Sequence, residues 1–112
     1  MTNLQYTTTT PETLEAFRNR PCSLPHYNAD FRAPTPEEVQ SLRRCLGLSQ
    51  TKLARLVGVQ WNAKGSNTVR KWETKQDSDS HRPISYSTWR LMLAFGGVID
   101  PMKDKTGLYE LD

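Results

Sequence analysis

Cationic side chains are concentrated in one segment of this 112-residue chain, residues 49–82. The segment holds seven Lys and Arg side chains against three Asp and Glu, and the whole chain has a formal net charge of +3. A positive segment of this kind is expected of a domain that binds a polyanion. The alternative is that these side chains only solvate helix faces, and the charge pattern leaves both interpretations open.

Residue types that support catalysis or hold a metal are few and poorly spaced. His26 and His81 are the only histidines, and neither has the spacing to Cys, Asp or Glu that a zinc site requires. The segment "DSDSH", residues 77–81, contains the residue types of a hydrolase triad, but they are adjacent in a polar loop. Triad groups normally come together from distant segments. We therefore expect no catalytic site, no metal and no cofactor.

Cysteine usage and hydropathy indicate a cytoplasmic protein. Cys22 and Cys45 are the only cysteines, which is too few for a disulfide framework, and we expect both to be reduced and structural. No stretch approaches the roughly 20 apolar residues of a membrane-spanning helix. The start, "MTNLQYTTTT", has neither the basic nor the apolar region of a signal peptide.

The strongest helix signals lie between residues 35 and 58. In "TPEEVQSLRRCLG", Thr35 and Glu38 can form a capping box, and Gly47 ends the helix. In "LSQTKLARLVGV", Ser49 is the expected cap and Gly58 the expected end. The apolar residues that we expect to face the core from these two helices are Val39, Leu42, Leu46, Leu53, Leu56 and Val57.

Three further helices are predicted from weaker signals. Thr10 is the expected cap of a short helix in "TTTTPETLEAFRNRP", and Ser85 is the expected cap of a longer one in "ISYSTWRLMLAFGG". Between them, "SNTVRKWETK" predicts a helix over residues 66–75, with Val69 and Trp72 facing inward because they lie three residues apart.

The predicted organisation is an all-α bundle of four to five helices with an extension at each end. Residues 1–34 form a short helix and an irregular arm, which lies either on its own domain or on a partner subunit. Residues 35–97 form the helical domain. Residues 98–112 are a short segment in which Pro101 and Gly107 act as breakers; it could hold an edge strand or form an ordered tail.

Residues 36–95 resemble the lambda-repressor-like (Cro/C1-type, XRE-like) helix-turn-helix family of DNA-binding proteins. The resemblance rests on "LSQTKLARLVGV", with the family's Ser-Gln start, Leu-Ala pair and Gly-Val turn, and on "TVRKWE", close to the family's usual third-helix ending. It implies a transcriptional regulator, a small dimeric repressor that reads a palindromic operator in double-stranded DNA. The helix over residues 66–75 would lie in the DNA major groove.

The resemblance also implies the residues that contact DNA. Four side chains at or near the start of the third helix are expected to read base edges: Ser66, Asn67, Arg70 and Lys71. Five are expected to contact the DNA backbone: Ser49, Gln50, Lys64, Thr68 and Lys75. Asn is suited to bidentate contact with adenine and Arg to contact with guanine.

The chain departs from the family between the two helices of the motif, where about five extra residues, "WNAKG", are inserted at 61–65. Asn62 and Gly65 favour turns, so we expect an enlarged turn and not a longer helix, with Lys64 beside the DNA backbone. Trp61 is expected to anchor the core; the alternatives are that it packs under the turn or rests on the sugar-phosphate surface.

The main alternative function is that of a protein-interaction module. In an antitoxin or inhibitor, the bundle would be secondary and the arm 1–34 would bind a protein partner. Retardation of promoter DNA by the pure protein favours the first function, and co-purification of a stoichiometric partner favours the second.

Overall fold

The computed structural model describes residues 9–111, and within them the chain forms six α-helices, one short 3-10 helix and no strand. The predicted all-α class is thereby confirmed. In chain order the helices are α1 (Leu14–Phe17), the 3-10 helix (Pro21–Ser23), α2 (Pro36–Cys45), α3 (Gln50–Val57), α4 (Asn67–Trp72), α5 (Tyr86–Phe95) and α6 (Pro101–Leu108). The first eight residues of the arm 1–34, and Asp112 of the tail, lie outside the described residues.

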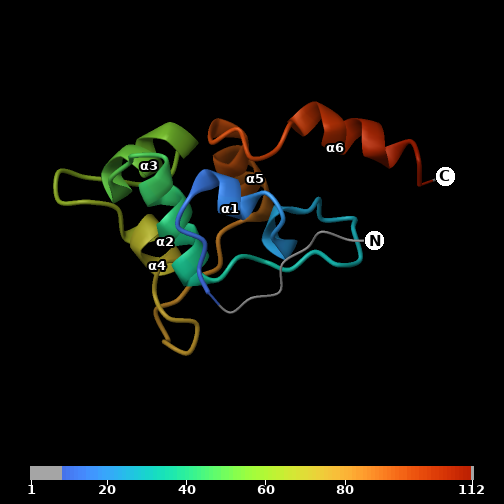
Figure 1. Ribbon diagram of the computed structural model, residues 1–112. Helices are drawn as coiled ribbons and strands as arrows, with labels where there is room; N and C mark the ends of the chain where they lie inside the picture. Colours follow the sequence, from blue (N-terminus) through green and yellow to red (C-terminus); the bar gives the residue numbers. More distant parts are fainter. Residues whose placement is uncertain (1–8, 112) are drawn as a thin grey trace.

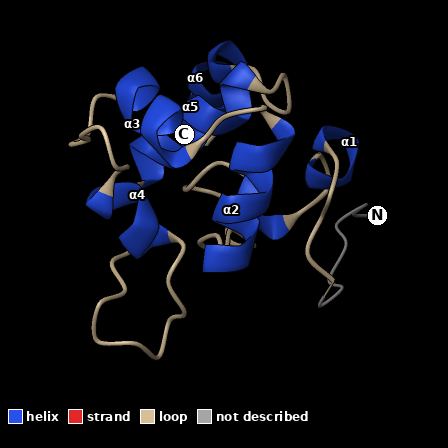
Figure 2. Cartoon of the chain, turned by 90° about the vertical axis from the view of Figure 1, so that its left-hand side faces the viewer, coloured by secondary structure: helices blue, strands red, loops and turns tan. Residues whose placement is uncertain are grey.

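The helices are arranged with α3 and α4 at one end of the molecule and α6 projecting from the other (Figure 1). Turned by 90°, the same chain shows α2 between α4 and α1, and a long loop that leaves α4 (Figure 2). None of the helices described in residues 9–111 is long and apolar enough to cross a membrane.

The predicted caps of α2 and α3 are confirmed. In the capping box of α2, the Glu38 backbone N–H donates to the Thr35 hydroxyl (3.1 Å) and the Thr35 backbone N–H donates to the Glu38 carboxylate (2.9 Å). The Ser49 hydroxyl accepts a hydrogen bond from the backbone N–H of Lys52. Gly58 ends α3 with φ of 83°, a left-handed conformation that glycine adopts without steric cost.

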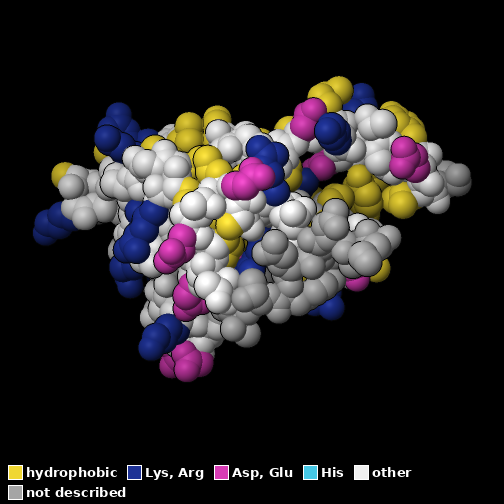
Figure 3. Space-filling view, in the orientation of Figure 1, with side chains coloured by type: hydrophobic (Ala, Val, Ile, Leu, Met, Phe, Trp, Pro, Cys, Tyr) yellow, Lys and Arg dark blue, Asp and Glu magenta, His cyan; other side chains and the backbone are white. Residues whose placement is uncertain are grey.

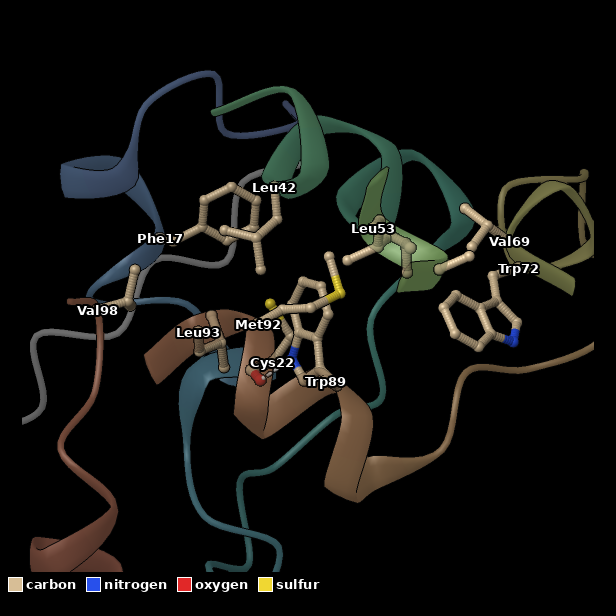
Figure 4. Packing of buried hydrophobic residues seen from close by; sticks show 12 residues of the cluster. Phe17, Cys22, Leu42, Leu53, Val69, Trp72, Trp89, Met92, Leu93 and Val98 are labelled. Carbon is tan, nitrogen blue, oxygen red and sulfur yellow. Dashed lines mark hydrogen bonds between the residues drawn. The ribbon is translucent and has the colours of Figure 1, made fainter. Parts of the chain in front are cut away.

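The core joins α1, α2, α3, α4 and α5 through a continuous set of buried apolar side chains (Figure 4). Trp89 of α5 is fully buried, contacts Phe17 edge to face with ring centroids 6.1 Å apart, and donates its indole N–H to the Cys22 carbonyl (2.7 Å). Phe17 and Cys22 belong to the arm 1–34. Through these two residues, the described part of the arm packs against the core of its own chain.

The first helix begins three residues later than predicted. Its cap is Thr13, whose hydroxyl accepts from the Ala16 backbone N–H, and not Thr10. The preceding segment is held against α2, because the Ser41 hydroxyl donates to the Pro11 carbonyl and the Cys45 thiol to the Glu12 carbonyl. These contacts keep residues 10–12 outside the helix.

Two further predictions are corrected in α3 and α4. Leu56 is 43% exposed and does not face the core. At about 100° per residue, Leu56 lies on the opposite side of Leu53 from Ala54 and Val57, which are the residues that pack inward. Helix α4 ends at Trp72, with Glu73 as its C-cap, and does not reach residue 75.

The tail 98–112 holds the helix α6 (Pro101–Leu108), so it is ordered but contains no edge strand within the described residues. Asp100 caps it by accepting from the Met102 backbone N–H (3.0 Å), and Pro101 occupies the first helical position, where proline is favoured. Gly107 lies inside the helix, where an added Cβ would collide with the Tyr27 hydroxyl. The Arg90 guanidinium binds the Asp104 carboxylate (2.7 Å) and ties α6 to α5.

Candidate nucleic-acid interface

A buried ion pair fixes the position of α4 relative to α2 and α3. Arg43 of α2 donates two hydrogen bonds to the Glu73 carboxylate (2.6 and 2.9 Å) and a third to the Leu48 carbonyl (2.9 Å). Gln50 at the start of α3 donates its side-chain amide to the same carboxylate (3.1 Å). The side chains of Arg43 and Glu73 are 10% and 3% exposed. Three helices therefore meet at one carboxylate, which limits their relative movement.

The inserted residues 61–65 form a short hairpin, so the prediction of an enlarged turn is confirmed. The backbone groups of Asn62 and Gly65 exchange two hydrogen bonds (2.8 and 3.1 Å), and the Asn62 side chain accepts from the Lys64 backbone N–H (2.8 Å). Gly65 has φ of 143°, which side-chain-bearing residues rarely adopt. The hairpin presents Lys64 to solvent.

Ser66 belongs to the internal frame of the motif. The residue is 4% exposed. Its hydroxyl accepts a hydrogen bond from the Val69 backbone N–H and donates one to the Gln60 carbonyl (2.6 Å). The hydroxyl caps α4 and fastens the end of the hairpin to it. A hydroxyl that is buried with two internal partners is not free to read a base, so Ser66 is removed from the base-reading set.

Helix α4 has one face in the core and one face in solvent. Val69 is fully buried and Trp72 is 6% exposed, as predicted. Asn67 and Arg70 are exposed on the other side, where their side chains lie within 3.5 Å of each other. Lys71, like Thr68, is half-buried.

The structure brings several of the predicted DNA-contacting residues around one hollow. It has a volume of about 270 Å³ and lies between the start of α3, the hairpin and α4. Its lining residues are Gln50, Asn62, Lys64, Gly65, Ser66, Asn67 and Arg70. Ser49 is exposed at the cap of α3, and Lys75 is exposed beyond the end of α4. Neither of these two lines the hollow.

The surface at this end of the molecule carries mainly positive side chains. Figure 3 shows Lys and Arg gathered along the left-hand edge occupied by α3, the hairpin and α4, with Asp and Glu set further to the right and at the bottom. Glu73, the one acidic residue within the motif, is buried against Arg43 and so adds no free negative charge to that edge. Such a surface attracts polyanions at long range.

Sequence reasoning missed two features of this region. The ion pair between Arg43 and Glu73 was not predicted, because the two residues are 30 positions apart and no local pattern relates them. Trp61 is 49% exposed, so its prediction as a core anchor is wrong. The Arg55 guanidinium lies over the Trp61 ring, 4.7 Å from its centroid. This contact could have been predicted from the sequence, because it places a tryptophan in an inserted turn next to a helix with cationic side chains.

The fold and this surface define a small all-α protein whose packed helices α3 and α4 present basic and amide side chains at one end. The chain is 34% identical over 65 residues to the transcriptional repressor protein KorC of Escherichia coli, a match that covers 58% of this chain and 68% of KorC. The chain belongs to the family of this repressor. No family model matches the chain, and no solved structure matches it.

Proposed function

We propose that this protein is a sequence-specific DNA-binding transcriptional repressor of the lambda-repressor-like type, and that α4 enters the DNA major groove. The relationship to KorC supports a repressor. The observation that carries the proposal is the division of α4, which buries Val69 and Trp72 and exposes Asn67 and Arg70. A helix held by its inner face and polar on its outer face can be inserted into the groove without unfolding.

The proposed base-reading residues are Asn67, Arg70 and Lys71. Asn67 is at the first position of α4, and its amide matches the donor and acceptor of adenine in the major groove. Arg70 lies one turn further on, and its guanidinium matches the two acceptors of guanine. Lys71 is half-buried and reaches the groove only through the end of its side chain.

The proposed backbone contacts surround this helix. Ser49 and Gln50 are at the N-terminus of α3, where free backbone N–H groups favour phosphate. Lys64 reaches out from the hairpin, and Lys75 follows the end of α4. Thr68 is half-buried beside Asn67 and contributes its hydroxyl. Contacts of this kind supply affinity without sequence preference and weaken as salt is added.

A dimer is part of the proposal, because one motif reads only a few base pairs. Two copies related by a two-fold axis would read a palindromic operator, with half-sites spaced by the separation of their α4 helices. The protein would act in the cytoplasm. The described part of the arm 1–34 is occupied by contacts with its own core, such as the hydrogen bond from Trp89 to Cys22. This favours DNA binding over the protein-interaction alternative.

Titration of DNA from upstream of the gene, with competitor DNA present, tests the proposal. The parent protein should retard this DNA, and Arg70→Ala should bind it more weakly. Lys103→Ala is the matched control, because Lys103 is an exposed cation on α6, at the other end of the molecule. Equal binding of upstream and unrelated DNA by the parent would contradict a sequence-specific repressor.

A further inference from the structure

An aromatic–cation pair joins the hairpin to α3. The Arg55 guanidinium from α3 lies 4.7 Å from the centroid of the Trp61 ring. Trp61 is 49% exposed and Arg55 is also exposed, so solvent reaches both side chains of the pair. Stacking on a ring restricts a guanidinium but leaves its in-plane N–H donors free for a planar or tetrahedral anion.

The pair lies next to the proposed reading helix. Trp61 and Asn67 line the same hollow, about 240 Å³ in volume, together with Gln60, Asn62 and Gly65. The neighbouring hollow, which Lys64 and Gln50 line, shares Asn62, Gly65 and Asn67 with it. Trp61 and Lys64 therefore line adjacent hollows, and Asn67 of α4 borders both.

Charge at the pair is uncompensated by the protein. None of the four ion pairs formed within residues 9–111 includes Arg55. An exposed tryptophan next to such a cation is a combination enriched at binding surfaces. Because the nearby exposed charges on α3 and the hairpin, Lys52 and Lys64, are also positive, the partner that this surface favours is an anion with an adjoining apolar face.

We propose that Arg55 and Trp61 form a second DNA contact, which binds the backbone of one strand beside the base pairs read by α4. Arg55 binds a phosphate through its free N–H edge, and Trp61 rests on the adjoining deoxyribose. With Lys64 exposed on the same hairpin, the hairpin lies along the strand and extends the footprint of each copy. This inference rests on the proposed function and adds the role of the inserted residues to it.

Affinity measured over a salt series separates this contact from base reading. Arg55→Gln should weaken binding to operator DNA and to random DNA equally. It should also reduce the slope of log affinity against log salt concentration by about 0.9, the value for one phosphate contact. Trp61→Ala should weaken binding to both DNAs, and the flanking sugars should become accessible to hydroxyl-radical cleavage in its complex. Lys103→Gln, a charge change on α6, is the control and should leave affinity and slope unchanged.

A double variant distinguishes direct contact from mere support of the hairpin. If Trp61 and Lys64 touch separate nucleotides, the fold-losses of Trp61→Ala and Lys64→Gln should multiply in the double variant. A double variant no weaker than the worse single one would overturn the direct contact. Affinity and salt slope equal to the parent's in both Arg55→Gln and Trp61→Ala would also overturn the direct contact. If Asn67→Ala still bound the operator more weakly in that case, the proposed function would stand. A parent that binds no DNA would overturn both.

Discussion

The Arg43 guanidinium and the Glu73 carboxylate are joined by two hydrogen bonds, of 2.6 and 2.9 Å, across 30 residues of sequence. The pair connects the last turn of α2 to the residue that caps the end of α4. With Gln50 bound to the same carboxylate, it also reaches the start of α3. The orientation of the proposed reading helix thus depends on a contact that no local sequence pattern contains.

Breaking this ion pair on one side should strongly destabilise the fold. Glu73→Gln leaves the Arg43 charge buried without its counter-charge, and should cost about 3–5 kcal/mol in the free energy of unfolding. The matched control is Glu15→Gln. It breaks the pair between Glu15 and Arg18, whose side chains are 83% and 50% exposed, and should cost less than about 1 kcal/mol. Urea unfolding of both variants measures the difference, and similar losses would contradict the structural role given to Glu73.

Two tryptophans of the motif should differ sharply when they are truncated. Trp72 is 6% exposed and packs in the core, so Trp72→Ala should cost about 3–5 kcal/mol and unfold much of a domain of this size. Trp61 is 49% exposed, so Trp61→Ala should cost about 1 kcal/mol or less. Thermal melting followed by circular dichroism compares them. A Trp72→Ala variant that melts like the parent would show that α4 is misplaced.

Deletion of residues 61–65 should preserve the fold and weaken DNA binding. The two ends that would be joined are close, because the Ser66 hydroxyl lies 2.6 Å from the Gln60 carbonyl oxygen. Loop-closure entropy changes slowly with loop length, so the loss of stability should be small. Operator affinity should fall with the loss of Lys64. Circular dichroism and DNA titration of the deletion variant decide: failure to fold would place the insert in the core, and parent-like affinity would make it a neutral spacer.

Cys22 should resist alkylation in the folded protein and make stability fall at alkaline pH. Burial, together with the negative charge of Glu38 whose carboxylate accepts from the thiol (3.4 Å), raises the pKa of Cys22 far above its usual range. The unfolded thiol loses its proton near pH 8.5 and the folded one does not. The folded state then binds more protons, so the free energy of unfolding declines as pH rises beyond that value.

Iodoacetamide labelling followed by mass spectrometry checks the first part of this prediction. Cys45 is only half-buried and should be labelled before Cys22, which should react at the rate of unfolding. A Cys22→Ala variant should lack the corresponding decline in unfolding free energy between pH 8 and 10. Rapid labelling of Cys22 in the native protein would contradict its burial.

The elements that the sequence predicted correctly are those determined by neighbours in the chain. The capping box of Thr35 and Glu38, the cap at Ser49 and the left-handed end at Gly58 all involve residues within one turn of each other. The enlarged turn was also predicted correctly, because Asn62 and Gly65 form it locally. Such features need no knowledge of the rest of the fold.

The elements that sequence reasoning missed depend on distant contacts. Gly107 was interpreted as a breaker, but it is the residue that lets α6 approach Tyr27, 80 positions earlier in sequence. Helix α1 starts later than predicted because the carbonyls of Pro11 and Glu12 are bound by Ser41 and Cys45 of α2. In the candidate site, Ser66 changed from a predicted reader to a buried cap because Gln60 accepts its hydrogen bond.

The affinity of Asn67→Ala for operator and for random DNA, measured side by side with the parent, tests the central claim most directly. Asn67 is exposed at the first position of α4, so the variant should fold normally and lose only a base contact. The account predicts a loss of roughly 1–3 kcal/mol on the operator and little change on random DNA. Equal losses on the two DNAs, or no loss on either, would contradict the assignment of α4 as the helix that reads the sequence.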